Sequence, residues 1–132
     1  MGYRSDVYIA VAFANEKDMK EVMAVYAMNP HVQKHNLLDH WDIRDGNILY
    51  FEEKHTKWYD AYEDVQGIEH MLSLVDDFFH SEREMPLAYR AIRIGEEPDD
   101  IEQREQHGDG DGSLIEKLFD GMSVTRHVEI LL

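Results

Sequence analysis

The chain has 132 residues, no cysteine and a formal net charge of −15, with 28 acidic against 13 basic residues. This length fits one domain that can fold without a metal or a disulfide, and the missing cysteines exclude disulfide scaffolds, cysteine zinc sites and thiol nucleophiles. The negative charge opposes direct binding to nucleic acid or to an anionic membrane.

The first predicted element is a strand over residues 6–14. Its large apolar residues alternate with residues that are themselves apolar or small, which is typical of a strand at the centre of a sheet. Asn15 is a suitable N-cap for the helix that follows, and Asn29-Pro30 ends it. The apolar stripe of this helix consists of Met19, Val22, Met23 and Tyr26.

A hairpin comes next, with a weak strand over 37–44, a turn at 45–47 and a strong strand from 48 to about residue 58. Asp60 and Glu63 have the spacing of a capping box, and a strongly amphipathic helix runs from there to about residue 80. Pro86 then interrupts the chain, and residues 87–94 form another strand.

This order of elements predicts an α+β fold with a ferredoxin-like βαββαβ antiparallel sheet and two helices on one face. We expect residues 1–95 to form this core and residues 96–112 to form a flexible acidic connection, with a possible short strand at 101–106. Residues 113–132 are expected to add a C-terminal helix and strand to the same domain.

Metal sites are disfavoured. His31 and His35 have the i, i+4 spacing of a helical zinc or nickel pair, but no glutamate follows His31 and the segment lies after a proline. Asp109 and Asp111 suggest a calcium loop, yet a leucine stands where an EF-hand requires glycine. We expect no metal and no cofactor.

Catalytic and nucleotide-binding motifs are not found. The serines lie in no Gly-x-Ser-x-Gly context, and the chain contains neither a P-loop nor Gly-x-Gly-x-x-Gly. Tyr8 and Tyr50 could lie on an open sheet face, as in RNA-recognition modules, but the third strand lacks their basic-Gly-aromatic signature. We therefore expect neither an enzyme nor direct nucleic-acid binding.

Two regions are candidates for binding a protein partner. Aromatic residues near a helix start are most often core, but beside exposed acids they would form an anchor with an acidic rim. The segment 95–112 holds eight acids and one base, and 60–84 has the same surplus. The candidate residues are Trp58, Tyr59, Asp60, Tyr62, Glu63, Asp64, Glu96, Glu97, Asp99, Asp100, Glu102 and Glu105.

Three short segments carry a resemblance to a known family. They are MGYRSDV at residues 1–7, KWYDAYEDV at 57–65 and RIGEE at 93–97. In order and spacing they resemble small acidic proteins encoded by tailed bacteriophages and prophages, over roughly residues 1 to 105. The resemblance implies an accessory protein that binds host machinery or host defence, and it carries over no catalytic residue.

No stretch is apolar enough to span a membrane, which predicts a cytoplasmic protein, and the resemblance implies the cytoplasm of an infected bacterial host. We expect it to be a monomer or homodimer that binds and modulates a host protein with a basic surface, without catalysis. The alternatives are a DNA mimic, a small histidine/carboxylate or metal-dependent enzyme, and a virion accessory protein.

Overall fold

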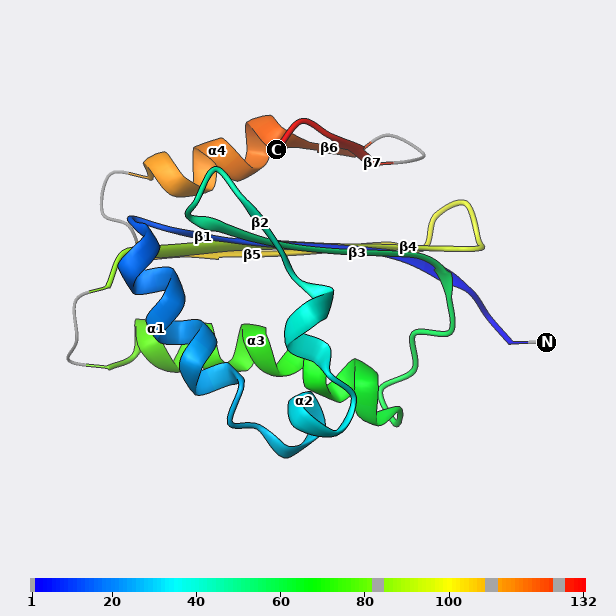
Figure 1. The fold of residues 1–132 in the computed structure, drawn as a ribbon. Helices are drawn as coiled ribbons and strands as arrows, with labels where there is room; N and C mark the ends of the chain where they lie inside the picture. The colour runs from blue at the N-terminus through cyan, green and yellow to red at the C-terminus, as the bar shows by residue number, and fades with distance from the viewer. Residues whose placement is uncertain (1, 82–84, 109–111, 125–127) are drawn as a thin grey trace.

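The computed structural model describes residues 2–81, 85–108, 112–124 and 128–132. Within them the chain forms three layers, with a five-strand antiparallel sheet in the middle (Figure 1). The strand order is β2-β3-β1-β4-β5, and the bounds are Ser5–Phe13 for β1, Asp42–Arg44 for β2, Ile48–Thr56 for β3, Leu87–Gly95 for β4 and Ile101–His107 for β5. The predicted α+β class with an antiparallel sheet is confirmed.

One face of the sheet carries the helices α1 (Glu16–Tyr26), α2 (Pro30–Lys34) and α3 (Glu63–Phe79) (Figure 1). As expected, β1 is central, and the side chains of alternate β1 residues share one apolar core with α1 and α3. That core includes Val7, Ile9, Val11, Phe13, Val22, Tyr26, Ile68, Leu72 and Val75. Burial of these side chains supplies the main driving force for folding.

The opposite face is covered by α4 (Ser113–Gly121) and by a small hairpin of β6 (Met122–Val124) and β7 (Val128–Ile130) (Figure 1). The expectation that Tyr8 and Tyr50 lie on an open face is therefore wrong, because they are only 3% and 2% exposed. Ile115 and Leu118 of α4 pack in the same apolar cluster as these tyrosines. Burial, followed by the charges of Asp6 and Glu52, raises the pKa of Tyr8 to about 12.

The predicted strand over 37–44 is mostly replaced by a turn of 3-10 helix, η1 (Leu37–His40), so that β2 has only three residues. Leu37 and Trp41 are buried in the helix-side core, where Leu37 lies against Gly67 of α3. Strand β3 ends at Thr56, not Trp58, after an irregularity in its register at which His55 has φ 55°. The Asp6 carboxylate accepts the His55 N–H at 2.8 Å and stabilises this irregularity.

Helix α3 begins at Glu63, with Tyr62 at its N-cap and no side chain capping it there. The predicted capping box of Asp60 and Glu63 is therefore wrong. Residues 101–107 form a strand that pairs along its length with β4, so the short strand predicted at 101–106 is confirmed, and the acidic connection predicted for 96–112 is sheet over these residues. None of the helices in the described part of the chain has the length and apolarity needed to cross a bilayer.

Candidate functional site

A cleft of about 790 Å³ lies between the N-terminal part of α3, the loop that precedes it and the neighbouring strands β4 and β5. The loop contributes Trp58, Tyr59 and Asp60 to its wall. The strands contribute Arg93, Glu102 and Arg104. These segments lie far apart in the sequence, and the cleft exists only because the sheet brings them together.

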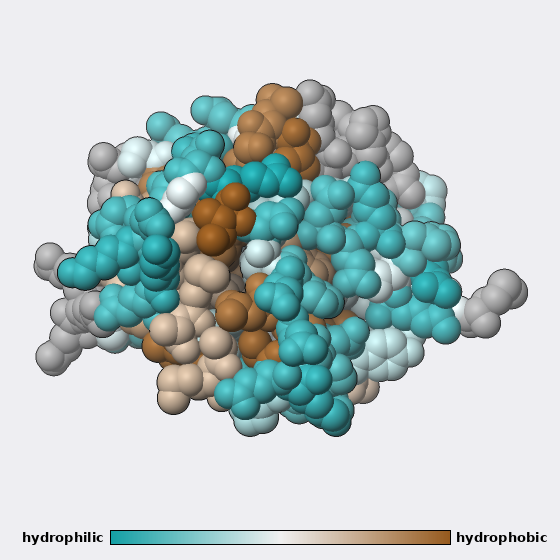
Figure 2. All heavy atoms as spheres, in the orientation of Figure 1, coloured by the Kyte–Doolittle hydropathy of each residue, from teal (hydrophilic) through white to brown (hydrophobic). Residues whose placement is uncertain are grey.

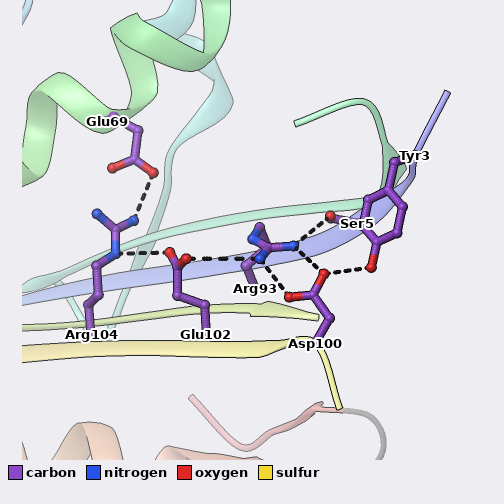
Figure 3. Close-up of polar contacts among 7 residues, drawn as sticks. All are labelled: Tyr3, Ser5, Glu69, Arg93, Asp100, Glu102 and Arg104. Carbon is purple, nitrogen blue, oxygen red and sulfur yellow. Dashed lines mark hydrogen bonds and ion pairs between the residues drawn. The ribbon is translucent and has the colours of Figure 1, made fainter. Parts of the chain in front are cut away.

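A chain of ion pairs forms the strand side of this cleft (Figure 3). Arg93 is the antiparallel partner of Glu102, and their closest atoms, Nη2 and Oε2, are 3.9 Å apart. Arg104 Nε lies 3.6 Å from Glu102 Oε1, and Arg104 Nη2 donates to Glu69 Oε1 of α3 at 2.7 Å. The network therefore ties α3 to the edge of the sheet and neutralises both arginines.

At the far end of the network, Asp100 connects β4 to the N-terminal segment (Figure 3). Its carboxylate accepts from Arg93 Nη1 and Nη2 at 3.1 and 2.8 Å and from the Tyr3 hydroxyl at 2.5 Å. The Tyr3 N–H in turn donates to Tyr59 Oη at 2.7 Å, which joins this cluster to the cleft wall. Gly95 is required beside it, because a Cβ there would collide with the Asp100 carboxylate and the Tyr3 hydroxyl.

The electrostatics of this cluster follow from these bonds. Arg93, and secondly Tyr3, hold the pKa of the Asp100 carboxyl below its ordinary value of 3.8. The bond to Asp100 raises the pKa of the Tyr3 hydroxyl, and it also raises the pKa of Arg93. The stable form of this cluster is therefore the Asp100 carboxylate, held by the Arg93 guanidinium and the neutral Tyr3 phenol.

These shifts predict a loss of stability in acid. A carboxyl whose pKa is lower in the folded state than in the unfolded state stabilises the fold above pH 3.8, and this contribution is lost as the pH falls through the folded pKa. We expect the urea midpoint to fall below about pH 4, and this fall to be smaller in Asp100→Asn, because asparagine has no charge to lose. Superimposable pH profiles for the wild type and the variant would contradict this role of Asp100.

The other predicted acidic residues are divided between the two faces of the sheet. Glu105 lies on the α4 face, where its Oε1 is 3.4 Å from Arg90 Nε. Glu96 accepts the Arg4 N–H at 2.8 Å, whereas Glu97 and Asp99 are exposed in the turn between β4 and β5. The six carboxylates of this stretch thus do not form one row of free charge, because Asp100, Glu102 and Glu105 have arginine partners.

The predicted aromatic residues are divided between contact with the core and the cleft wall. Trp58 is half-buried, with its ring centroid 5.7 Å from that of Phe51 in the core, and it also lines the cleft. Tyr59 and Tyr62 meet edge to face at 5.3 Å, and Tyr62 is 42% exposed. Asp60 is exposed at the cleft wall, and no cation of the described residues pairs with its carboxylate.

Glu63 and Asp64 lie outside this cleft. Glu63 Oε1 accepts from Lys34 Nζ at 2.7 Å, and its Oε2 lies 3.3 Å from His31 Nδ1, so Glu63 ties α3 to α2. Lys34 in the first place, with smaller contributions from His31 and His35, lowers the pKa of Glu63. The Asp64 carboxylate accepts the N–H of Val65.

The described residues contain no group of three or more histidine, aspartate or glutamate side chains placed to hold a metal ion. His31 and His35 both lie near Glu63, but Lys34 occupies that carboxylate. Asp109 and Asp111 fall outside the described residues.

The sequence interpretation missed the basic half of the cleft, Arg93 and Arg104, and the bridging residue Tyr3. A signal was present in β4, because Arg90 and Arg93 are three positions apart and must point to opposite faces of a strand. One of these two arginines therefore had to face the helices.

The chain has no detected relative among known proteins: no protein-family model, no curated protein and no solved structure matches it.

Proposed function

We propose that this protein is a non-catalytic binding protein whose cleft receives a basic side chain of a partner protein. The observation that carries the proposal is the chemistry of the cleft wall. Trp58 and Tyr59 contribute aromatic rings to this wall, a residue type that attracts cations, and the exposed Asp60 is their neighbour in it. The arginines of the cleft already have carboxylate partners, so they do not repel a second cation strongly.

The charge of the chain supports the same partner. Two segments, 60–84 and 95–112, each hold eight acids and one base, and both contribute residues to this end of the molecule. Hydrophilic residues cover much of the face seen in Figure 2, with apolar residues in a band between them. An acidic surface accelerates the approach of a basic partner and makes the association rate fall with added salt.

The identity of the partner follows from the resemblance to phage-encoded acidic proteins. We propose a bacterial host protein, bound in the cytoplasm of the infected cell for host takeover or counter-defence. The three segments that carry the resemblance meet at this cleft, through Tyr3, through Trp58 with Tyr59, and through Arg93. We further propose that the core is a ferredoxin-like sheet extended by β5, and the order β2-β3-β1-β4 supports this.

The alternatives are less well supported by the geometry. A DNA mimic needs spaced rows of free carboxylates, whereas three acids of the segment 96–105 have arginine partners. The enzyme and virion alternatives gain no observation in their favour from the cleft.

The proposal predicts that neutralising Asp60 weakens partner binding. The immobilised wild type and the variants Asp60→Asn and Asp120→Asn are used to capture proteins from a bacterial lysate. We expect the partner recovered by the wild type to bind Asp60→Asn at least about fivefold more weakly, equivalent to roughly 1 kcal/mol. Asp120→Asn is the matched control, since it removes the same charge from an exposed position on α4, across the sheet.

Equal recovery of the partner by Asp60→Asn, or its selective loss from Asp120→Asn, would contradict the proposal. Both variants change one exposed side chain, so their circular dichroism spectra are expected to match that of the wild type.

A further inference from the structure

The outer side of β5 is an edge of the sheet in the described part of the chain. β5 is last in the strand order, pairs only with β4 there, and five of its seven side chains are exposed. An edge strand of this length presents unpaired backbone groups that another strand can bind.

The hydrogen bonds at the two ends of the β4–β5 ladder identify these groups. Gly95 N–H donates to Asp100 O, and Gly108 N–H donates to Leu87 O, both at 2.8 Å. In an antiparallel pair, alternate residues bond to the same neighbour. Even-numbered residues of β5 therefore bond to β4, and the backbone N–H and C=O of Gln103 and Glu105 point outward.

We propose that β5 pairs antiparallel with β5 of a second copy of this chain, with Gln103 opposite its own counterpart on the two-fold axis. The two sheets then join into one continuous sheet. The pairing uses the outward backbone groups of β5, whose Glu102 and Arg104 side chains also line the cleft, and it does not rest on the proposed function.

The charges of β5 select this register. With Gln103 at the axis, Glu102 of each copy lies opposite Arg104 of the other, on the helix side of the sheet. Registers centred on Glu102, Arg104 or Glu105 instead place two like charges directly opposite, which is destabilising. The favoured register also joins the ion networks of the two copies. The chain of Arg93, Glu102 and Arg104 in one copy meets that of the other where Glu102 lies opposite Arg104.

The chain has no cysteine, so one introduced thiol reports the register directly. Opposed residues of a hydrogen-bonded antiparallel pair have Cα atoms about 5.5 Å apart, within reach of a disulfide. We expect Gln103→Cys to form a disulfide-linked dimer under an added oxidant. Glu105→Cys is the matched control, because its Cα lies opposite residue 101 of the second copy and roughly 13 Å from the other introduced thiol.

A second pair of variants tests the backbone contact without cross-linking. Gln103→Pro removes an outward N–H that the β4–β5 ladder does not use, whereas Gln103→Ala removes the same side chain and keeps that N–H. In sedimentation equilibrium we expect the wild type and Gln103→Ala to dimerise with rising concentration. Gln103→Pro is expected to stay monomeric with an unchanged circular dichroism spectrum.

Cross-linking at least tenfold greater for Gln103→Cys than for Glu105→Cys supports the register. Equal cross-linking of the two variants, or a wild type that is monomeric at every concentration, would overturn the proposal.

Discussion

Replacing Arg90 with alanine is expected to destabilise the fold by about 3 kcal/mol. This is the low end of the range for removing the buried partner of an ion pair, which Arg90 forms with Glu105. Arg90 is only 5% exposed and lies between β4 and the C-terminal layer. It donates to the carbonyl of Met122 and to Gln103 Oε1 at 2.8 Å, and its guanidinium stacks 4.5 Å from the Phe119 ring centroid. Alanine leaves the Met122 carbonyl and Gln103 Oε1 without this donor and removes a polar contact between the sheet and the C-terminal layer.

Urea unfolding followed by circular dichroism measures this effect. Lys117→Ala is the matched control, because Lys117 lies on α4 and pairs with Asp45 at 3.1 Å in an exposed position. An exposed pair contributes at most about 1 kcal/mol, so this variant should unfold close to the wild type. Equal destabilisation by the two substitutions would mean that Arg90 does not hold the C-terminal layer.

Gly67→Ala is expected to cost roughly 1–3 kcal/mol, although alanine ordinarily stabilises a helix interior by about 1 kcal/mol relative to glycine. Gly67 is buried in α3, where an added Cβ would overlap Cδ1 of Leu37 and lie 3.4 Å from Cβ of His31. Leu37 is almost completely buried in η1, and a close-packed interior resists the shift of its side chain that the added Cβ would require. The Gly67 carbonyl also accepts the Tyr26 hydroxyl at 2.9 Å, which fixes the helix against α1.

Thermal unfolding of Gly67→Ala and of Ser73→Ala separates packing from helix propensity. Ser73 lies on the exposed side of the same helix, so its replacement should change stability by no more than about 0.5 kcal/mol. If Gly67→Ala were more stable than the wild type, the close packing of α3 on η1 would be wrong.

The fold was predictable where apolar periodicity was strong. β1, β3 and β4 and the helices α1 and α3 lie close to their predicted positions, because each buries a face that the sequence marks. The segment 37–44 was misassigned because residues 37–40 leave the sheet and pack on α3, where Leu37 lies against Gly67. This tertiary contact overrides the local preference for a strand.

β5 shows a different limit of sequence reasoning. Its acids and polar residues suggested a solvated connection, since only Ile101 is apolar in Ile101–His107. The partners that stabilise it, Arg90 and Arg93 of β4 and Glu69 of α3, lie in other elements. The acidic half of the candidate site could be predicted from charge, whereas its basic half required the register of β4 and β5.

Titration of the ¹⁵N-labelled protein with an arginine-rich peptide, followed through its amide and indole resonances, tests whether the cleft wall receives a cation. We predict the largest shifts at the Trp58 indole and at the amides of Tyr59 and Asp60, and a clear reduction of these shifts in Asp60→Asn. Shifts concentrated instead on α4 around Glu116 and Asp120, or unchanged in Asp60→Asn, would show that the cation does not bind at the cleft wall.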